Sequence, residues 1–340
     1  MVEFLSLSER DRRFIIQQIS ADTGMSVKAI EKDWWVTVVL KAIFSLPMRE
    51  HFIFKGGTSL SKGWKLIERF SEDIDIALAP EAFGETYEPR PGHSYIKRLK
   101  RKGCAYTSTV IKEALIQQLA AMGLPQGIIS VEAADVDPLI PDKDPQTLLI
   151  TYPSFFDQNP YIAEAVRVEL GVRSYKEPFA NVNIKSIIAE EIGITTYSEQ
   201  PFIVRAAEPK KTFIEKMLLL HEKFAGNLPT PAAGERHSRH LVDLFQMMKK
   251  GIAKQVLDSP ELYTAIVEHR RYYVKLKNVD YNNLQMASLN FIPPLALTEQ
   301  YRKDYETMQA EMIYGESPAF EDMLNQLEEL RVRMMRNENW

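Results

Sequence analysis

Cysteine is nearly absent from this sequence of 340 residues, since Cys104 stands alone. A single cysteine excludes an internal disulfide framework, so a reducing cytoplasm is the expected compartment. Long apolar stretches are missing as well, because no run reaches the roughly 18 residues that a membrane-spanning helix needs. The first residues also lack a basic stretch followed by an apolar one, so no secretion signal is expected. These absences predict a cytoplasmic protein with no membrane partner.

Positive charge is not in excess, because 42 Lys and Arg face 46 Asp and Glu, for a formal net charge of −4. This balance excludes a surface that is basic throughout. It does not exclude a nucleic-acid substrate, since a local basic patch attracts a phosphate backbone even when acids dominate the total. The length and the hydrophobic share of 45% allow two domains, each with its own core.

The spacing of apolar residues changes along the chain. Up to about residue 195, strand and helix patterns alternate, with strands expected at 51–54, 74–78, 147–152 and 165–171 and helices at 58–70 and 106–122. Two earlier helices are expected to begin after the caps Ser8 and Ser26. From about residue 210 the pattern is helical. The expected fold class is therefore α+β, with a mixed β-sheet domain flanked by helices over residues 1–200 and a mainly helical domain over residues 201–340.

Two acidic residues alternate with isoleucines in the segment Asp73-Ile74-Asp75-Ile76. Successive side chains of a strand point to opposite faces, so the carboxylates share one face while the isoleucines enter the core. Two carboxylates a strand repeat apart can hold a hard cation through oxygen, and magnesium needs few protein ligands because it retains water and takes phosphate oxygens. This pattern predicts a magnesium site on Asp73 and Asp75.

A glycine turn precedes these acids in the segment Gly56-Gly57-Thr58-Ser59. Two glycines allow the backbone N–H groups to approach a phosphate closely. A helix beginning near Thr58 directs its positive end toward the same phosphate, and Ser59 adds a hydroxyl donor. Arg69, shortly before the acids, is a candidate second contact to a triphosphate. Each half of this arrangement is common by itself, but an apolar strand, a Gly-Gly turn, a helix and Asp-x-Asp in this order resemble the signature of the nucleotidyltransferase β-like fold.

That fold needs a third carboxylate from a neighbouring strand. In Val166-Arg167-Val168-Glu169-Leu170 the polar residues alternate with apolar ones, so Glu169 can project on the polar face. We expect Glu169 to be the third metal ligand. The alternative is a solvent-exposed strand residue or a partner for Arg173.

Two later helical segments narrow the resemblance. Lys211-Thr212-Phe213-Ile214-Glu215-Lys216 and Arg236-His237-Ser238-Arg239-His240-Leu241-Val242-Asp243 follow the glycine and Asp-x-Asp motif in the order typical of the AbiEii/AbiGii toxin family of nucleotidyltransferases, which the chain resembles over residues 55–244. By spacing alone, Lys216 could cover core residues with its aliphatic stem, and Asp243 could form an ordinary helix ion pair with Arg239.

The family resemblance implies a bilobed protein in which the helical domain completes the active-site cleft. It implies transfer of a nucleoside monophosphate from an NTP, with Mg²⁺ or Mn²⁺ held by Asp73 and Asp75, while Glu169 is the third ligand that the strand pattern predicts. The family motif assigns Gly57 and Ser59 to the phosphate turn, and Gly56 and Thr58 belong to the same predicted turn. The resemblance makes Lys216 and Asp243 residues of the catalytic nucleotide site. We expect Lys216 and Arg69 to neutralise the charge of the triphosphate.

The same resemblance suggests the biological setting. Characterised relatives are toxins of bacterial toxin–antitoxin or phage-defence (abortive infection) systems, and some add nucleotides to the 3′ end of tRNA. The partners expected for this chain are therefore an NTP, an RNA acceptor such as tRNA, and a cognate antitoxin. For the RNA, basic residues gather between Tyr95 and Lys102. The expected phosphate contacts are Lys97, Arg98, Lys100 and Arg101, and the alternative is a solvated basic face.

Two other functions stay open at this stage. The first keeps the chemistry but changes the acceptor to a protein hydroxyl or a small molecule, which the motif cannot distinguish. The second is a degenerate nucleotide-binding module without catalysis. The intact pair Asp73 and Asp75 argues against decay, because loss of a metal-binding acid is its usual mark.

Overall fold

The computed structural model describes residues 2–136, 139, 143–157, 162–193, 195–225 and 237–336. The chain divides into two compact units. The first consists of residues 1–63, 70–88 and 92–206, and the second of residues 64–69, 89–91 and 207–340. Two short segments from the first part of the chain therefore pack with the second unit, which the sequence did not indicate.

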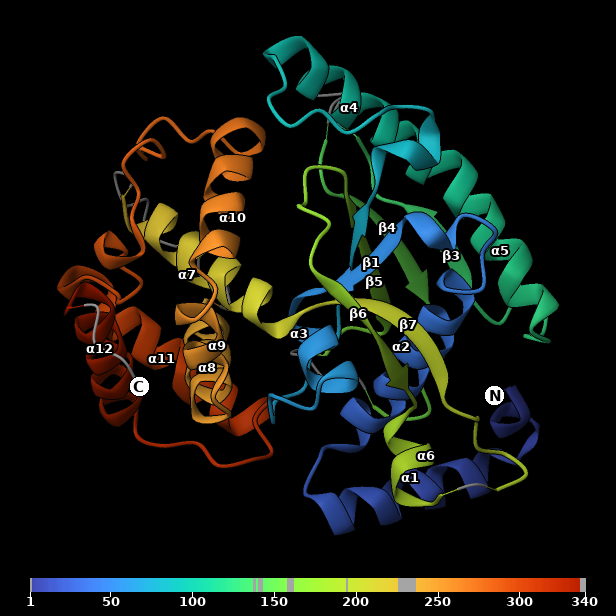
Figure 1. The fold of residues 1–340 in the computed structure, drawn as a ribbon. Coiled ribbons are helices and arrows are strands. Elements are labelled where there is room, and N and C mark those ends of the chain that lie inside the picture. Colours follow the sequence, from blue (N-terminus) through green and yellow to red (C-terminus); the bar gives the residue numbers. More distant parts are fainter. Residues whose placement is uncertain are drawn as a thin grey trace. The chain divides into compact units, whose positions relative to one another are not determined.

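The first unit is built on a mixed sheet (Figure 1), which has seven strands within the described residues. Their order across the sheet is β3-β4-β5-β2-β1-β7-β6. The central pair β1 and β2 is antiparallel, whereas β2 with β5 and β1 with β7 are parallel. The strands are β1 (Phe52–Lys55), β2 (Ile74–Leu78), β3 (Ser130–Ala133), β4 (Gln146–Thr151), β5 (Ala165–Gly171), β6 (Phe179–Ile184) and β7 (Phe202–Ala207).

Helix α2 (Val27–Ile43) forms much of the core of this unit, because nearly all of its residues are buried. It packs against β5 and against the helices α1, α5 and α6. The expected caps are confirmed, since Ser8 accepts a hydrogen bond from the Asp11 amide and Ser26 from the Ala29 amide. The other α-helices of the unit are α1 (Glu9–Thr23), α3 (Gly56–Thr58), α4 (His93–Tyr106), α5 (Lys112–Ala121) and α6 (Ile187–Glu191).

The two helices predicted in the middle of this region differ from the observed ones. The helix expected over 58–70 ends early, because α3 continues only into one π-helical turn, Ser59–Gly63. Lys65 then adopts a left-handed conformation with φ of 53°, and the Glu68 amide donates to Gln246 in the second unit instead of continuing a helix. The helix expected over 106–122 is longer at its start, since α4 begins at His93 and runs through a π-helical turn into α5.

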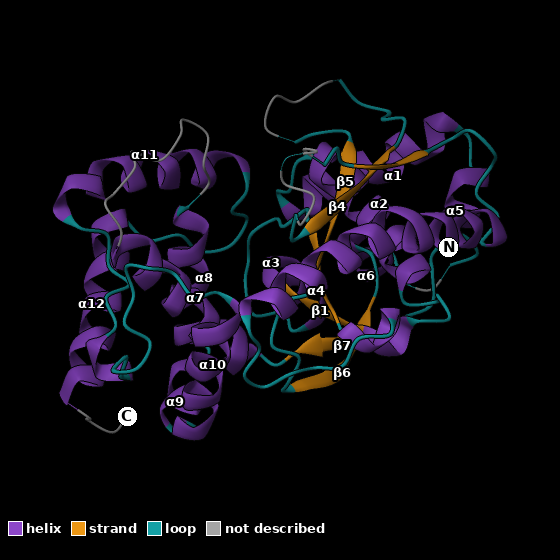
Figure 2. Cartoon of the chain, turned by 90° about the horizontal axis from the view of Figure 1, so that it is seen from above, coloured by secondary structure: helices purple, strands orange, loops and turns teal. Residues whose placement is uncertain are grey.

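The described part of the second unit contains helices and no sheet strand, as Figure 2 shows by the restriction of orange arrows to the first unit. Helix α7 packs against α8, α9 and α10, and α8 packs against α11 and α12. The mainly helical character predicted for the end of the chain is confirmed. No helix among the described residues is long and apolar enough to cross a membrane. The α-helices are α7 (Pro209–Ala225), α8 (Ser238–Lys249), α9 (Ile252–Leu257), α10 (Pro260–Tyr273), α11 (Leu295–Glu311) and α12 (Phe320–Arg336).

Candidate functional site

The two acids at the start of β2 lie on one face of the sheet, with Asp75 in the strand and Asp73 directly before it. Ile74 and Ile76 are fully buried, whereas Asp73 and Asp75 are only partly buried. This alternation confirms the strand reading of Asp-Ile-Asp-Ile, in which the two carboxylates share the face opposite the core.

Strand register brings Glu169 to the same place. β5 runs parallel to β2 with Asp75 opposite Glu169, and on the other side of β2 Lys55 is opposite Asp75. Residues opposite each other on paired strands project to the same face. Glu169 therefore lies beside Asp75 although 94 residues separate them in the sequence (169 − 75).

Arg167 binds two of these acids, a contact that the sequence analysis missed. Its Nη2 atom lies 2.9 Å from Glu169 Oε1, and its Nε atom lies 3.7 Å from Asp73 Oδ1. The hydrogen bond to Glu169 raises the pKa of the guanidinium further. The signal was the alternation itself, which put Arg167 on the same face as Glu169. Arg173, considered above as a partner for Glu169, instead binds Asp144 at 2.7 Å.

Gly56 fits closely against Asp75. Its φ of 74° is a left-handed conformation that favours glycine. A β-carbon at this position would collide with the Asp75 carboxylate. Position 56 therefore needs a glycine because a side chain there would overlap Asp75, whether or not the turn also contacts a phosphate.

The hydroxyls of the turn bond within the protein. Thr58 Oγ1 donates to the backbone carbonyl of Asp73, and Ser59 Oγ donates to the carbonyl of Gly56 at 2.9 Å. Both side chains are fully buried. Thr58 thus ties the turn to the acidic strand, while the role of Ser59 as a phosphate donor remains a prediction.

The buried Lys32 forms an ion pair with Glu72, the residue directly before Asp73. Lys32 Nζ, on α2, lies 2.6 Å from Glu72 Oε2 and 2.9 Å from the carbonyl of Ala163. Because the Lys32 side chain is 2% exposed, this pair positions the start of the Asp-Ile-Asp segment from the core side. No sequence signal identified Lys32, since it stands between Glu31 and Asp33, where an ordinary exposed charged segment of a helix would be expected.

The donor set suits magnesium. The Asp75 side chain makes no hydrogen bond or ion pair with any described residue, so its oxygens are available to a ligand. No group of three or more acidic, histidine or cysteine side chains in the described ranges is arranged to hold a metal ion, and two of the three predicted ligands bind Arg167. Magnesium is commonly bound by one or two carboxylates together with substrate phosphates. Asp75 therefore fits the ion as a ligand, and Asp73 and Glu169, on the same face of the sheet, stay predicted ligands.

A second charged cluster lies within the second unit. Asp243, on α8, is completely buried and binds two cations. Arg69 contacts both carboxylate oxygens, at 2.7 and 2.8 Å, and Lys216 Nζ lies 2.8 Å from Oδ2. Arg69 is only 4% exposed. The structure thus brings together three residues that lie far apart in the sequence and that are all predicted for the nucleotide site.

Protonation in this cluster follows from the ion pairs. Burial alone raises the pKa of Asp243, but the charges of Arg69 and Lys216 outweigh it and hold that pKa well below the ordinary value. Burial lowers the pKa of Lys216 despite Asp243. His240 Nδ1 lies 3.4 Å from Lys216 Nζ, and burial together with the charges of Lys216 and Arg239 holds its pKa well below the usual range. His240 is therefore a neutral neighbour of the ion pairs at pH 7. Arg236, in the same sequence motif, lies outside the described residues.

The predicted basic patch lies on α4. Lys97, Arg98 and Arg101 are exposed and Lys100 is half-buried. Arg98 and Lys102 both bind Glu85, at 3.2 and 2.5 Å. The helix therefore presents basic groups to solvent, with part of their charge neutralised by one glutamate.

Comparison with known families fits this arrangement. A family model described as "Nucleotidyl transferase AbiEii toxin, Type IV TA system" matches residues 38–326. The chain belongs to this family. The resemblance predicted from the glycine turn, the acid pair and the two helical motifs is confirmed, and with it a general role as a nucleotidyltransferase toxin of a toxin–antitoxin system. No curated protein matches the chain.

Proposed function

We propose that this AbiEii-family protein transfers a nucleoside monophosphate from an NTP to a hydroxyl of RNA, with the 3′ end of tRNA as acceptor, and releases pyrophosphate. The observation that carries the proposal is the juxtaposition of Asp75 with Glu169 and with the backbone of Gly56. It combines oxygen ligands for a cation with a glycine turn suited to phosphate, as nucleotidyl transfer requires.

The acids would hold Mg²⁺, or Mn²⁺ in its place. Asp73 and Asp75 are the proposed ligands, and Glu169 completes the set on the neighbouring strand. The ion would supply charge stabilisation at the phosphate oxygens and a lower pKa for the acceptor hydroxyl. Arg167, which contacts Asp73 and Glu169 on the same face, would offer its guanidinium to a phosphate of the substrate.

The protein itself contributes mainly position and charge. The acceptor hydroxyl attacks the α-phosphorus in line with the departing pyrophosphate, a reaction that depends on alignment and electrostatics. Lys216 and Arg69 are proposed to neutralise the triphosphate. Asp243 then acts as a positioning residue, because its carboxylate orients both cations.

The family description supports an antitoxin as partner. We propose that the protein is the toxin of an abortive-infection system, with a separately encoded antitoxin that suppresses its activity. Induced expression tests the toxin role: wild-type protein should arrest growth, whereas Asp75→Asn, made at equal level, should not.

The deciding experiment incubates purified protein with Mg²⁺, each α-labelled NTP in turn, and total tRNA, with Asp73→Ala/Asp75→Ala as control. Label on tRNA that disappears in the control would establish RNA nucleotidyl transfer and identify the nucleotide. Label on the protein would replace RNA by a protein hydroxyl as acceptor. Absence of label with tRNA, protein and small-molecule acceptors would favour a binding module without catalysis.

A further inference from the structure

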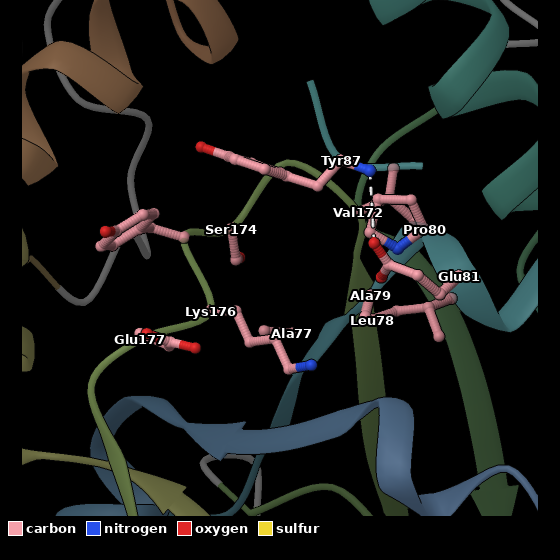
Figure 3. Close-up of a pocket in the computed structure, with 11 residues that line it drawn as sticks. Ala77, Leu78, Ala79, Pro80, Glu81, Tyr87, Val172, Ser174, Lys176 and Glu177 are labelled. Carbon is pink, nitrogen blue, oxygen red and sulfur yellow. Dashed lines mark hydrogen bonds between the residues drawn. The ribbon is translucent and has the colours of Figure 1, made fainter. Parts of the chain in front are cut away.

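A cavity of about 310 Å³ lies within the first unit where β2 ends (Figure 3). One side is formed by β2 and the residues that follow it, from Ala77 to Glu81, and the other by the segment after β5, from Val172 to Glu177. Tyr87 completes the wall, and its side chain extends over the open space in Figure 3. The volume lies at the lower end of the range of small-molecule sites, roughly 300–1,000 Å³.

The floor of this cavity continues the acidic face of the sheet. Ala77 follows Asp75 by two residues in β2, so it projects to the same side as the carboxylate, and Ala79 comes directly after the end of the strand. Gly171, opposite Ala77, stands two residues beyond Glu169. On this face of the sheet, the acids of β2 and β5 are therefore followed by the small residues Ala77 and Gly171. Ala77 lies about 7 Å from Asp75 along the strand, a distance that one nucleotide can span.

The walls offer aromatic rings and a cation. Tyr87 and Tyr175 both line the cavity, and burial, assisted by the nearby Tyr175 and Tyr95 hydroxyls, raises the pKa of Tyr87 to about 12. Lys176 and Ser174 make no side-chain hydrogen bond or ion pair with the described residues. The lining also contains the carboxylates of Glu81 and Glu177, and Glu81 Oε1 accepts a hydrogen bond from the Tyr87 amide. The two rings suit a flat aromatic base, and Lys176 offers a contact for one phosphate, which together is the chemistry of a nucleotide.

Helix α4 lies directly against this wall. Gly103 approaches Val172, a lining residue, so closely that a β-carbon would overlap the valine side chain. Tyr95, also on α4, donates from its hydroxyl to the carbonyl of Thr86, next to Tyr87, at 2.6 Å. The basic groups of α4 therefore belong to a helix that packs against the cavity wall. They provide contacts for further phosphates of the same RNA.

We propose that this cavity binds the terminal nucleotide of the RNA acceptor, with its base against Tyr87 and Tyr175, its phosphate at Lys176, and its ribose hydroxyl directed along β2 toward Asp75. The preceding phosphates contact the basic face of α4. This inference rests on the proposed function for its choice of RNA, and it adds the part of the protein that recognises the acceptor.

The test measures RNA binding separately from transfer. The full-length protein is titrated into a short, 5′-fluorescein-labelled single-stranded RNA without Mg²⁺, and transfer of α-labelled NMP to the same RNA is measured with Mg²⁺. Tyr87→Ala and Tyr175→Ala should each weaken RNA binding by at least about fivefold, whereas Tyr87→Phe should bind as wild type, because stacking needs the ring and not the hydroxyl. Lys176→Gln should reduce the slope of log affinity against log salt by about 0.7, the value for one phosphate of a single strand.

Matched controls separate the cavity from general damage. Tyr197→Ala removes a half-buried tyrosine that does not line the cavity, and Lys112→Gln removes a cation on α5, so both should bind RNA as wild type. Binding of a fluorescent NTP analogue should be unchanged in all these variants. Circular dichroism identifies any variant that has lost its fold. If Tyr87→Phe and Tyr87→Ala are both folded, the difference in their RNA affinity measures the contribution of the Tyr87 ring.

The outcomes distinguish this proposal from the transfer reaction. Loss of RNA binding in the cavity variants alone supports the acceptor site, even if wild-type protein transfers no nucleotide to RNA. Transfer and RNA binding that are unchanged in both tyrosine variants would overturn the acceptor site while leaving the proposed function intact. Weaker binding of the NTP analogue with unchanged RNA binding would also overturn it, because the cavity would then belong to the donor nucleotide.

Discussion

Asp75 and Asp243 are both carboxylates held inside folded units, yet their surroundings are opposite. Asp75 is half-buried beside Glu169 and makes no side-chain bond with the described residues. Asp243 is fully buried and binds Arg69 and Lys216. A partly buried carboxylate without a cation costs free energy unless a ligand supplies the charge. A buried carboxylate between two cations compensates their charges, so its removal alone is strongly destabilising. The comparison predicts that Asp75 serves a ligand and that Asp243 serves the structure that positions other groups.

Replacing Asp75 by Asn tests the first half of this comparison and has the largest expected effect. We expect transfer to fall by about 10³-fold or more, the scale of losing a preorganised charge at a reacting phosphate. The unfolding midpoint in urea should change little, since no described ion pair is lost. Single-turnover transfer and urea unfolding of the same preparation measure both quantities. A large loss of stability would show that Asp75 is structural.

Replacing Asp243 by Asn tests the second half. It leaves Arg69 and Lys216 buried without a counter-charge, so the free energy of unfolding should decrease by about 3–5 kcal/mol. Replacing all three residues together, as Arg69→Met/Lys216→Met/Asp243→Leu, should recover most of that loss because no charge remains buried. Urea unfolding followed by circular dichroism compares the variants. A stable single variant would contradict the structural role of Asp243.

Gly56→Ala tests whether the close approach of Gly56 to Asp75 is needed for activity, and Gly84→Ala is its matched control. Both glycines have nearly the same left-handed φ, 74° and 75°, so each substitution costs about 1–2 kcal/mol of backbone strain. Only at Gly56 would the new carbon collide with Asp75. A carboxylate displaced by about 1 Å can lower transfer by about 100-fold. Equal activity of the two variants would show that the contact between Gly56 and Asp75 does not affect transfer.

His240→Gln has the smallest expected effect and examines the buried cluster by pH. The folded pKa of His240 lies well below its unfolded value of about 6.5, so the unfolded chain takes up a proton first as pH falls. The stability that His240 contributes is therefore present above about pH 6.5 and is lost as pH falls below it, by up to roughly 1.4 kcal/mol per pH unit. Urea unfolding between about pH 7 and 5 should show a shallower slope for the variant. An unchanged slope would mean that another group takes up the proton.

Local patterns predicted several features correctly. The alternation of apolar and acidic residues placed β2 and β5 at their observed bounds and put Asp73 and Asp75 on one face. Serine caps placed the starts of α1 and α2. These features depend on residues within a few positions of one another, so the sequence contains the information directly. The helix expected over 58–70 was wrong because contacts of Glu68 with α8 replace helical hydrogen bonds.

The sequence by itself determined the local chemistry of this protein: the acid pair, the glycine turn and the motifs of the AbiEii family. Only the tertiary structure decided which distant groups meet. It placed Glu169 beside Asp75, joined Arg69 to Asp243 across 174 positions, and brought the segment after β5 over Ala77 to form the cavity. The physical reason is that strand register and packing depend on the whole sheet and core. The spacing of apolar residues along one strand or helix says which face is buried, but not which distant residue that face contacts.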